Sequence, residues 1–324
     1  MRIYTVNIME KNNRPRLTII VVNWNTLALL RDCLDSLLRK DMGITHEIIV
    51  VDNASADGSP QMVMETFPSV RLICNAENRG FAKANNQAIK VAQGDYILLL
   101  NSDTVVPDNH IFPEWLSFMD RHPEAGASGC MLVKADGAHW VGDAGFKPSF
   151  GTIFNYSFFL SKLFPGYFKG IFLNYRVTTA AAEVDWVSGA AFLIRRAILP
   201  EVGLLDENVF MYAEDVEWGC RIRSKGYKIF YLPELVIIHL VGASTKNRKE
   251  GVFSHLWIEN LRRLYQRFNP KQPLFLFDLV FAAGLLLRSF LYLVVYMASR
   301  QDKWRHKFKE TFSYFSFLAL KKRE

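Results

Sequence analysis

The feature that most constrains the fold is a regular alternation of apolar runs and amphipathic segments between residues 17 and 100. Four of the runs are continuous and apolar, and most of them are rich in β-branched residues: LTIIVVN (17–23), EIIVVDN (47–53), VRLICN (70–75) and YILLL (96–100). Runs of this kind are typical of strands that are buried on both faces of a parallel sheet. We therefore predict four parallel strands in the first third of the chain.

Helical patterns occupy the intervals between these runs. After the first run, leucines recur with the spacing of one helical face: Leu27, Leu30, Leu34, Leu37 and Leu38. Ser59 and Pro60 suit an N-cap and a first helical position. A third helix is predicted to carry Phe81, Ala84, Ala88 and Ile89 on one face, with Gly94 ending it. Strands that alternate with helices predict a doubly wound α/β fold with a mostly parallel sheet flanked by helices.

Three of the four runs end in polar residues: Asn23-Trp24-Asn25, Asp52-Asn53 and Asn101-Ser102-Asp103. Turn chemistry explains one such end. Three together favour a binding site, because ligands of α/β sheets bind beyond the carboxyl ends of the strands. We therefore expect the three tips to meet at one edge of the sheet.

The middle of the chain, residues 107–185, is aromatic and irregular, and it suits either a loop-rich insertion near a binding site or core. From Val184 the pattern becomes regular again. A strand is predicted to run into a short helix, followed by a second helix, a turn at Gly226 and two strands that lead to His239.

The positive charge is confined to the C-terminal part of the chain. The net charge is +7, but residues 261–324 carry 13 Lys/Arg and 4 Asp/Glu, a net of +9, which leaves residues 1–260 at −2. This distribution argues against nucleic acid as a partner and for an anionic partner near the C-terminus.

Cysteine usage and the N-terminal sequence indicate a reducing compartment. The four cysteines form no C-x-x-C pair and lie in apolar segments, as buried thiols of a cytosolic protein do. Residues 1–16 contain no apolar core of signal-peptide length, so we expect the main domain to remain in the cytoplasm.

The polar tips favour nucleotide and cation chemistry, although the glycine fingerprints of dinucleotide sites and P-loops are missing from the sequence. The Asp103 carboxylate can hold a divalent cation that neutralises a diphosphate. The Asp52 carboxylate can accept hydrogen bonds from a ribose or a base. Arg79 can bind phosphate, and Gly80 allows the backbone to approach a ligand closely.

Five motifs in order, VVNWN, VVDNASADGS, NRGFAKANNQAI, LLLNSDT and FMYAEDVEWGCR, with a histidine after the last, resemble a family 2 glycosyltransferase of the GT-A fold. The subgroup is similar to bacterial rhamnosyltransferase-like enzymes of surface polysaccharide synthesis. The resemblance covers roughly residues 17–245. It implies a nucleotide-diphosphate-sugar donor, of which a UDP- or dTDP-sugar fits best. It also implies a divalent metal, Mg²⁺ or Mn²⁺, inversion at the anomeric carbon, and a glycan or lipid-linked acceptor.

The resemblance also assigns roles to individual residues. Asp215 is the general base, with Glu214 beside it, and Asp103 and His239 are metal ligands. By the same resemblance Asp52 contacts the nucleotide, and together with the polar strand ends and the Arg79–Gly80 turn the residues expected on the donor side are Asn23, Asn25, Asp52, Asn53, Arg79, Gly80, Asn85, Asn101, Ser102 and Gly189. Asn101 departs from the usual Asp-x-Asp motif and leaves Asp103 as its one carboxylate. We therefore expect modest metal affinity that depends on the diphosphate and on His239.

Some of these residues have simpler explanations that remain open. A Glu-Asp pair at a helix start is favourable by itself, and that position predicts an ionised Asp215. His239 can be a satisfied core histidine, and Trp186, Ser188 and Gly189 suit packing as well as acceptor contact. Two other functions also remain: a sugar-phosphate nucleotidyltransferase, and a non-catalytic scaffold that binds nucleotide-sugars.

The last predicted element is an apolar segment, residues 279–298, that is long enough to span a bilayer. Arg288 makes full insertion marginal, and basic clusters lie on both sides of the segment. A helix in the cytoplasmic interface, in contact with anionic lipid, fits this pattern better than a span or a soluble packing helix. We therefore divide the chain into residues 1–16, a catalytic domain (17–265) and a helical membrane-associating tail (266–324), which predicts peripheral or monotopic attachment.

Overall fold

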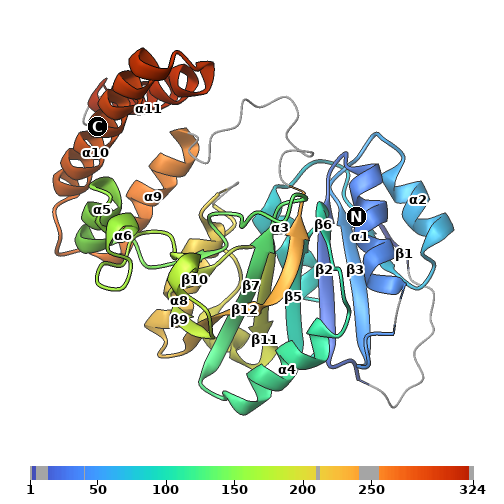
Figure 1. The fold of residues 1–324 in the computed structure, drawn as a ribbon. Coiled ribbons are helices and arrows are strands. Elements are labelled where there is room, and N and C mark those ends of the chain that lie inside the picture. Colours follow the sequence, from blue (N-terminus) through green and yellow to red (C-terminus); the bar gives the residue numbers. More distant parts are fainter. Residues whose placement is uncertain (1, 5–13, 40, 209–211, 241–254, 321–324) are drawn as a thin grey trace. The chain divides into compact units, whose positions relative to one another are not determined.

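A computed structural model describes residues 2–4, 14–39, 41–208, 212–240 and 255–320 (Figure 1). Two compact units are formed. Unit 1 consists of Met1–Gly145 and Thr178–Lys249, and unit 2 of Phe146–Val177 and Glu250–Glu324. The division differs from the predicted boundary at residue 265, because the aromatic segment 146–177 packs with the C-terminal helices. The predicted functional domains themselves stay a prediction.

A ten-stranded sheet forms the centre of unit 1. Along the sheet the strands are β1 (Arg2–Tyr4), β4 (Arg71–Cys74), β3 (His46–Asp52), β2 (Leu17–Asn23), β5 (Tyr96–Asn101), β11 (Ala191–Arg195), β7 (Ala125–Val133), β12 (Lys228–His239) and β6 (Thr104–Val105), with β9 (Ala182–Val184) beside β12. A separate two-stranded sheet pairs β8 (Ala144–Gly145) with β10 (Trp186–Val187). The four predicted strands are β2, β3, β4 and β5, and their buried side chains confirm that both faces are covered.

The sheet is mixed, and the prediction of a mostly parallel sheet holds for its first half. Strands β4, β3, β2 and β5 are parallel, as is the pair β7–β12. Strand β11 is antiparallel to both β5 and β7, and β6 and β9 are antiparallel to β12. Helix α4 (Ile111–Arg121) connects β5 to β7, which run in the same direction, but β11 comes from later in the chain, lies between them and is antiparallel to both.

Six helices accompany the sheet in the described part of unit 1: α1 (Leu27–Leu38), α2 (Ser59–Thr66), α3 (Phe81–Ile89), α4 (Ile111–Arg121), α7 (Leu199–Val202) and α8 (Glu214–Ser224). The predicted start of α2 was one residue late. Gly58 is the N-cap, and Asp57 Oδ1 accepts the Ser59 N–H. Helix α3 ends at Ile89, before Gly94. Gly94 instead allows close packing on β2, since a Cβ there would lie 2.5 Å from the Thr18 nitrogen.

Two further predictions need correction. The segment 107–185, expected to be irregular, contributes helix α4 and the central strand β7. Strand β7 has the sequence AGASGCMLV, and its small residues give no strong strand pattern. The two strands expected before His239 are one strand, β12, with a register shift between Leu232 and Val236. Pro233 lies inside the shift, and a residue without an N–H interrupts a ladder in this way.

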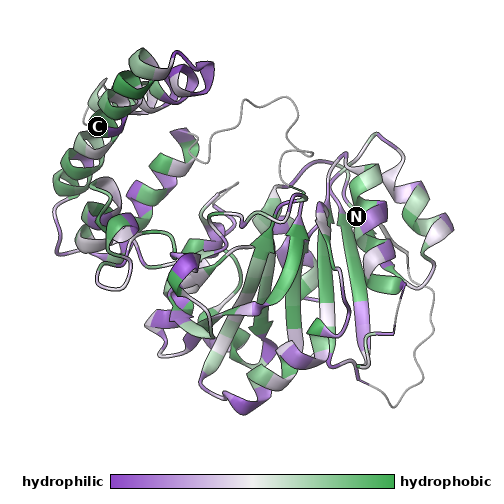
Figure 2. Cartoon of the chain, in the orientation of Figure 1, coloured by the Kyte–Doolittle hydropathy of each residue, from purple (hydrophilic) through white to green (hydrophobic). Residues whose placement is uncertain are grey.

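Unit 2 is helical over its described residues. Its helices are α5 (Phe150–Ser157), α6 (Leu160–Leu163), a 3₁₀ turn (Tyr175–Val177), α9 (His255–Phe268), α10 (Leu274–Ser299) and α11 (Asp302–Leu320). Helix α10 packs on α5, α9 and α11. It is long and apolar enough to cross a membrane, with a mean hydropathy of 2.0 over 18 residues of which 33% are buried. Figure 2 shows its hydrophobic character along most of its length.

Aromatic contacts join segment 146–177 to the C-terminal helices. The Tyr156 ring stacks on Phe281 of α10 at 6.4 Å, and Phe172 stacks on Trp257 of α9 at 5.8 Å. Segment 146–177 therefore forms part of the core of unit 2. Of the two interpretations of its sequence, core and loop-rich insertion, packing supports core for this part.

Candidate active site

Hydrogen bonds connect the three polar strand ends of unit 1. Strands β3, β2 and β5 are adjacent, so Asn23 lies opposite Asp52, and Val22 lies opposite Asn101 (Figure 1). Asn23 Nδ2 donates to Asp52 Oδ1 at 2.9 Å. The Thr26 hydroxyl donates to Asn23 Oδ1 at 2.6 Å and lies 3.0 Å from the Ser102 hydroxyl. The expectation that these tips meet at one edge of the sheet is confirmed.

Asp52 is more deeply buried than a ligand contact requires. Its residue is 2% exposed, and its second oxygen accepts the Ser55 N–H at 2.9 Å. With the hydrogen bond from Asn23 to the first oxygen, both carboxylate oxygens of Asp52 have partners, and the bond from Ser55 holds the loop after β3. A carboxylate oxygen has a second lone pair, so contact with a nucleotide needs no rearrangement of these bonds. The donor role of Asp52 stays a prediction.

Asn25 and Asn53 position the loops around this edge. Asn25 is exposed at φ 53°, and its Oδ1 accepts the Ala56 N–H at 2.8 Å. Asn53 is buried, and its Nδ2 donates to the Gly80 carbonyl at 3.2 Å. Asn53 thereby connects the end of β3 to the start of α3.

The start of α3 presents a cation. Gly80 is the N-cap of α3 at φ 78°, a conformation that favours glycine. Arg79 is exposed, and within the described residues it makes no ion pair. Asn85 is 1% exposed and donates to the Phe81 carbonyl at 3.0 Å, so part of its amide is used inside the helix.

Asp103 and His239 lie side by side, as the metal prediction requires. Pairing of β6 with β12 places His239 opposite Thr104. His239 Nε2 lies 3.1 Å from Asp103 Oδ1 and 3.4 Å from Asn101 Nδ2. Asp103 and His239 are each 6% exposed, so this nitrogen and oxygen meet in a nearly dry setting.

This pair fits a divalent cation that takes further ligands from a substrate. Two neighbouring ligands of an octahedral cation at about 2.1 Å lie about 3.0 Å apart, close to the separation seen here. The Asp103 carboxylate is the ligand type that suits Mg²⁺ and Mn²⁺, whereas the His239 imidazole is more typical of later transition metals such as Zn²⁺. The described residues contain no group of three His, Cys, Asp or Glu arranged for a metal, so further ligands have to come from elsewhere.

Asp215 is the second residue of α8 and lies beside the same sheet edge. Its Oδ2 accepts the Gly189 N–H at 2.9 Å, and its Oδ1 accepts the Val216 N–H at 2.8 Å. The carbonyl of the next residue, Ala190, accepts the Asn101 N–H at 3.1 Å. Gly189 suits this position because a Cβ there would lie 3.2 Å from the Phe81 ring. The backbone around Gly189 therefore links the base candidate to the metal motif.

Burial changes the protonation expected of the Glu214–Asp215 pair. Burial raises the pKa of Asp215, while the N–H groups of Gly189 and Val216 oppose that rise. Burial and the neighbouring Asp215 charge raise the pKa of Glu214 to about 8. The helix N-terminus lowers carboxylate pKa values, but desolvation outweighs it at this pair.

Several residues that build this edge were not predicted from the sequence. Thr26 bridges two strand ends, and Asp57 Oδ2 accepts the Leu27 N–H at 2.8 Å. The Asp143 carbonyl accepts the Ser188 N–H at 2.8 Å, and its carboxylate accepts the Tyr231 hydroxyl at 2.8 Å. Asp57 lies within the quoted VVDNASADGS motif and could have been found there, whereas no sequence pattern marks Asp143.

Comparisons with known proteins agree with this architecture. The family model "Glycosyltransferase like family 2" matches residues 15–265. An N-acetylglucosaminyl-diphospho-decaprenol L-rhamnosyltransferase of Mycobacterium tuberculosis is 29% identical over 210 residues, 61% of this chain and 67% of that protein. The O-antigen biosynthesis protein RfbC of Myxococcus xanthus is 27% identical over 243 residues, 72% of this chain but 18% of its own length.

Solved structures show the same fold. A mannosyltransferase from Pyrobaculum calidifontis, in complex with GDP-Man and Mn²⁺, superposes with a TM-score of 0.59 at 21% identity, over 96% of this chain and 87% of that one. The mixed sheet, its flanking helices and the matching family model together lead to one assignment: the chain belongs to glycosyltransferase family 2 and has the GT-A fold.

Proposed function

We propose that the chain moves a sugar from a UDP- or dTDP-sugar to a glycan or lipid-linked acceptor, with inversion, in cell-surface polysaccharide synthesis. One observation carries the proposal: the backbone at Gly189–Ala190 binds the Asp215 carboxylate on one side and the strand end at Asn101 on the other. Asp103 and His239 lie at that same strand end. A base and a cation-binding pair at one sheet edge are the two parts that sugar transfer from a nucleotide-diphosphate requires.

On the donor side, Asp103 and His239 would hold Mg²⁺ or Mn²⁺, which when bound supplies positive charge to stabilise the departing diphosphate. Asp52 would accept hydrogen bonds from the nucleoside, and the Arg79 cation at the Gly80 turn would bind phosphate. Asn23, Asn53 and Ser102 hold the loops that surround the donor.

On the acceptor side, Asp215 would take the proton of the attacking hydroxyl. Its raised pKa makes it a stronger base than an exposed aspartate, and the Gly189 and Val216 N–H groups fix its orientation. Glu214, with a pKa of about 8, keeps its proton at neutral pH and can donate a hydrogen bond. Its Oε2 is buried and has no partner among the described residues.

Unit 2 would attach the enzyme to the cytoplasmic face of the membrane as a peripheral or monotopic protein. Of the described large apolar side chains that are exposed, all but Trp24, Met64 and Val141 belong to this unit. Residues 261–324 add a net charge of +9, which complements anionic lipid. The M. tuberculosis relative is named for a diphospho-decaprenol substrate, which supports a lipid-linked acceptor for this chain too.

A thermal-shift screen of UDP-, dTDP- and GDP-sugars with Mn²⁺ or Mg²⁺ tests the donor, and transfer by Asp215→Asn tests the base. The variant should bind donor like the wild type but lose about 10²–10⁴-fold in transfer rate. Transfer at the wild-type rate would remove Asp215 from the mechanism. Incubation with a nucleoside triphosphate and a sugar 1-phosphate tests the alternative nucleotidyltransferase. A chain that binds donors but neither transfers nor hydrolyses them would be a scaffold.

A further inference from the structure

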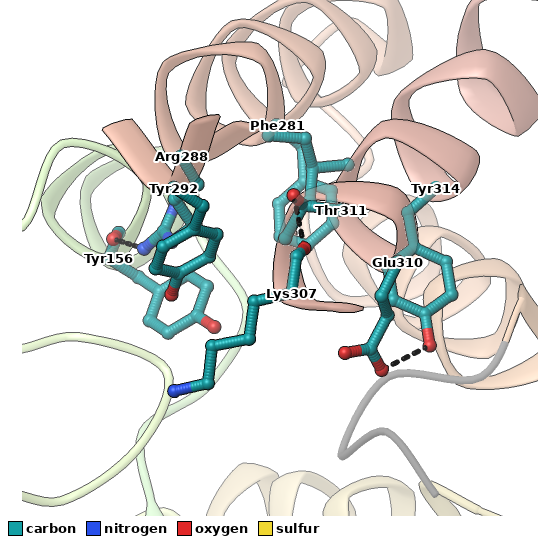
Figure 3. Close-up of a pocket in the computed structure, with 9 residues that line it drawn as sticks. Tyr156, Phe281, Arg288, Tyr292, Lys307, Glu310, Thr311 and Tyr314 are labelled. Carbon is teal, nitrogen blue, oxygen red and sulfur yellow. Dashed lines mark hydrogen bonds between the residues drawn. The ribbon is translucent and has the colours of Figure 1, made fainter. Parts of the chain in front are cut away.

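Unit 2 contains a cavity between α5, α10 and α11 that the transferase chemistry does not use (Figure 3). Its volume is about 230 Å³, below the range of about 300–1,000 Å³ that holds drug-sized ligands. The polar side chains in its lining are those of Tyr156, Arg288, Tyr292, Lys307, Glu310, Thr311 and Tyr314. Most of the inner surface is apolar, and the charged side chains at its wall let the cavity take a small group that carries charge.

Arg288 contributes a positive charge that no carboxylate neutralises in the described structure. Its Nη1 donates to the Ser157 carbonyl at 2.8 Å, and its Nη2 donates to the Tyr156 carbonyl. The guanidinium also lies 4.6 Å from the Tyr156 ring centroid and 4.4 Å from that of Phe159. These carbonyls end α5, where the helix dipole is negative, so the cation is stabilised without losing its charge.

A tight helix–helix contact fixes Arg288 in this position. A Cβ on Gly284, one turn before it in α10, would lie 2.5 Å from the Ser157 Cβ. Ser289 donates to Thr311 of α11 at 2.9 Å, which holds the third helix in register. The arginine that made a membrane span marginal in the sequence thus points at protein backbone and at the cavity.

Lys307 supplies the second cation of the cavity. Its Nζ lies 5.0 Å from the Trp304 ring centroid and 5.7 Å from that of Tyr292, and it makes no ion pair with a described residue. The one carboxylate in the lining, Glu310, accepts the Tyr314 hydroxyl at 3.1 Å. Two cations against one carboxylate leave the cavity with a net charge of +1, so an anion is favoured.

We infer that this cavity binds the phosphate group of a membrane lipid, while the exposed apolar side chains of α10 contact its hydrocarbon chain. Basic pockets between membrane-associated helices bind phosphate headgroups in this way. Leu291 and Val295 are exposed apolar residues that lie three and seven positions after Arg288, and therefore on its face of the helix. The inference rests on the membrane attachment proposed above and is independent of the donor site. The phosphate has two possible sources, an anionic phospholipid and the polyprenyl diphosphate of a lipid-linked acceptor.

Four single variants of α11 in the full-length protein separate binding at this cavity from the general electrostatic attraction of basic residues to an anionic membrane. Lys307→Gln removes the cation of the cavity. Lys303→Gln is its control, since Lys303 is also exposed and also lies over the Trp304 ring, but does not line the cavity. Glu310→Gln removes the carboxylate of the cavity, and Asp302→Asn removes an exposed carboxylate in the first turn of the same helix. Arg288 is left unchanged because its loss would leave the α5 carbonyls unpaired.

Flotation measures binding to phosphatidylcholine vesicles, plain or doped to equal surface charge with phosphatidylglycerol or with a polyprenyl diphosphate. Each lysine variant should lose about fivefold in affinity for charged vesicles through diffuse attraction. Lys307→Gln should lose about tenfold more than Lys303→Gln, because it also loses a charge-assisted hydrogen bond. Glu310→Gln should bind more tightly than Asp302→Asn. Thermal melting and transfer to a water-soluble acceptor should be unchanged in all four variants.

The results also identify the lipid. An extra loss on both charged vesicles means that the cavity accepts phosphate headgroups in general, and an extra loss on the polyprenyl diphosphate vesicles alone assigns it to the lipid-linked acceptor. Inorganic phosphate should compete away the difference between the two lysine variants. Equal effects within each matched pair would overturn the site while leaving membrane attachment intact. If the wild type floats with none of the vesicle types, membrane attachment itself is refuted. The thermal shift induced by a nucleotide-sugar would still test donor binding by the transferase separately.

Discussion

Replacing Glu214 with glutamine should change how the stability of the protein depends on pH. Glu214 is 8% exposed, its Oε2 has no described hydrogen-bond partner, and its pKa lies at about 8. A carboxyl whose pKa is raised on folding stays protonated in the folded state while the unfolded chain releases the proton. The contribution of this carboxyl to the unfolding free energy is therefore fully present below its unfolded pKa of 4.5, and it is lost as the pH rises towards about 8.

The size of the effect follows from this interval. It spans roughly 3.5 pH units, and each unit corresponds to about 1.4 kcal/mol of unfolding free energy. Asp215 interacts with Glu214 and shares part of the titration. We therefore expect a loss of about 3 kcal/mol in the wild type between pH 5 and pH 8 from this carboxyl. Glu214→Gln, which cannot ionise, should match the wild type at pH 5 and exceed its stability at pH 8.

Denaturant unfolding followed by circular dichroism at pH 5, 6, 7 and 8 measures this difference. Glu65→Gln is the control, because Glu65 is exposed on α2 and the substitution is chemically the same. The control curve should run parallel to the wild type. A gap between wild type and Glu214→Gln that stays constant from pH 5 to pH 8 would refute the reasoning, since it would mean that Glu214 is already ionised or solvated in the folded protein.

Three further substitutions test the metal pair, the packing of α8 and the network behind the site. Asp103→Ala should weaken metal-dependent donor binding in calorimetry, and unchanged affinity with unchanged chelator sensitivity would exclude it as a ligand. Gly219→Ala should cost about 1–3 kcal/mol of unfolding free energy, because a Cβ there would lie 2.6 Å from the Asp185 carbonyl oxygen. Its control is Gly151→Ala on α5, where a Cβ meets nothing within 4 Å and the change should be neutral or stabilising. Equal melting temperatures of the two variants would contradict this. Tyr231→Phe should cost about 1–3 kcal/mol by leaving a buried carboxylate short of one donor, and wild-type stability in chemical denaturation would show that this bond is dispensable.

The first half of the sheet could be predicted because its determinants are local. An apolar run such as residues 17–23 has to be buried on both faces wherever it folds, and the polar residues that follow it have to lie at a strand end. The meeting of Asn23, Asp52 and Ser102 follows from these two facts and from parallel order. The second half of the sheet could not be predicted in the same way. The Gly- and Ala-rich strand β7 has no strong strand pattern, and its place between β11 and β12 depends on pairing with residues more than 60 positions away.

The sequence by itself determined the family motifs, the strand ends that carry Asp52, Asn101 and Asp103, and the apolar, basic character of the C-terminal helices. Tertiary structure alone decided that β6–β12 pairing brings His239 to Asp103, and that burial gives Glu214 a pKa of about 8. It also decided that Arg288 lies against the end of α5, which the sequence places some 130 residues earlier. The physical reason is the same in each case. Apolar periodicity and turn chemistry act over a few residues and can be read along the chain, whereas desolvation, ion partners and ligand pairs depend on which distant segments pack together.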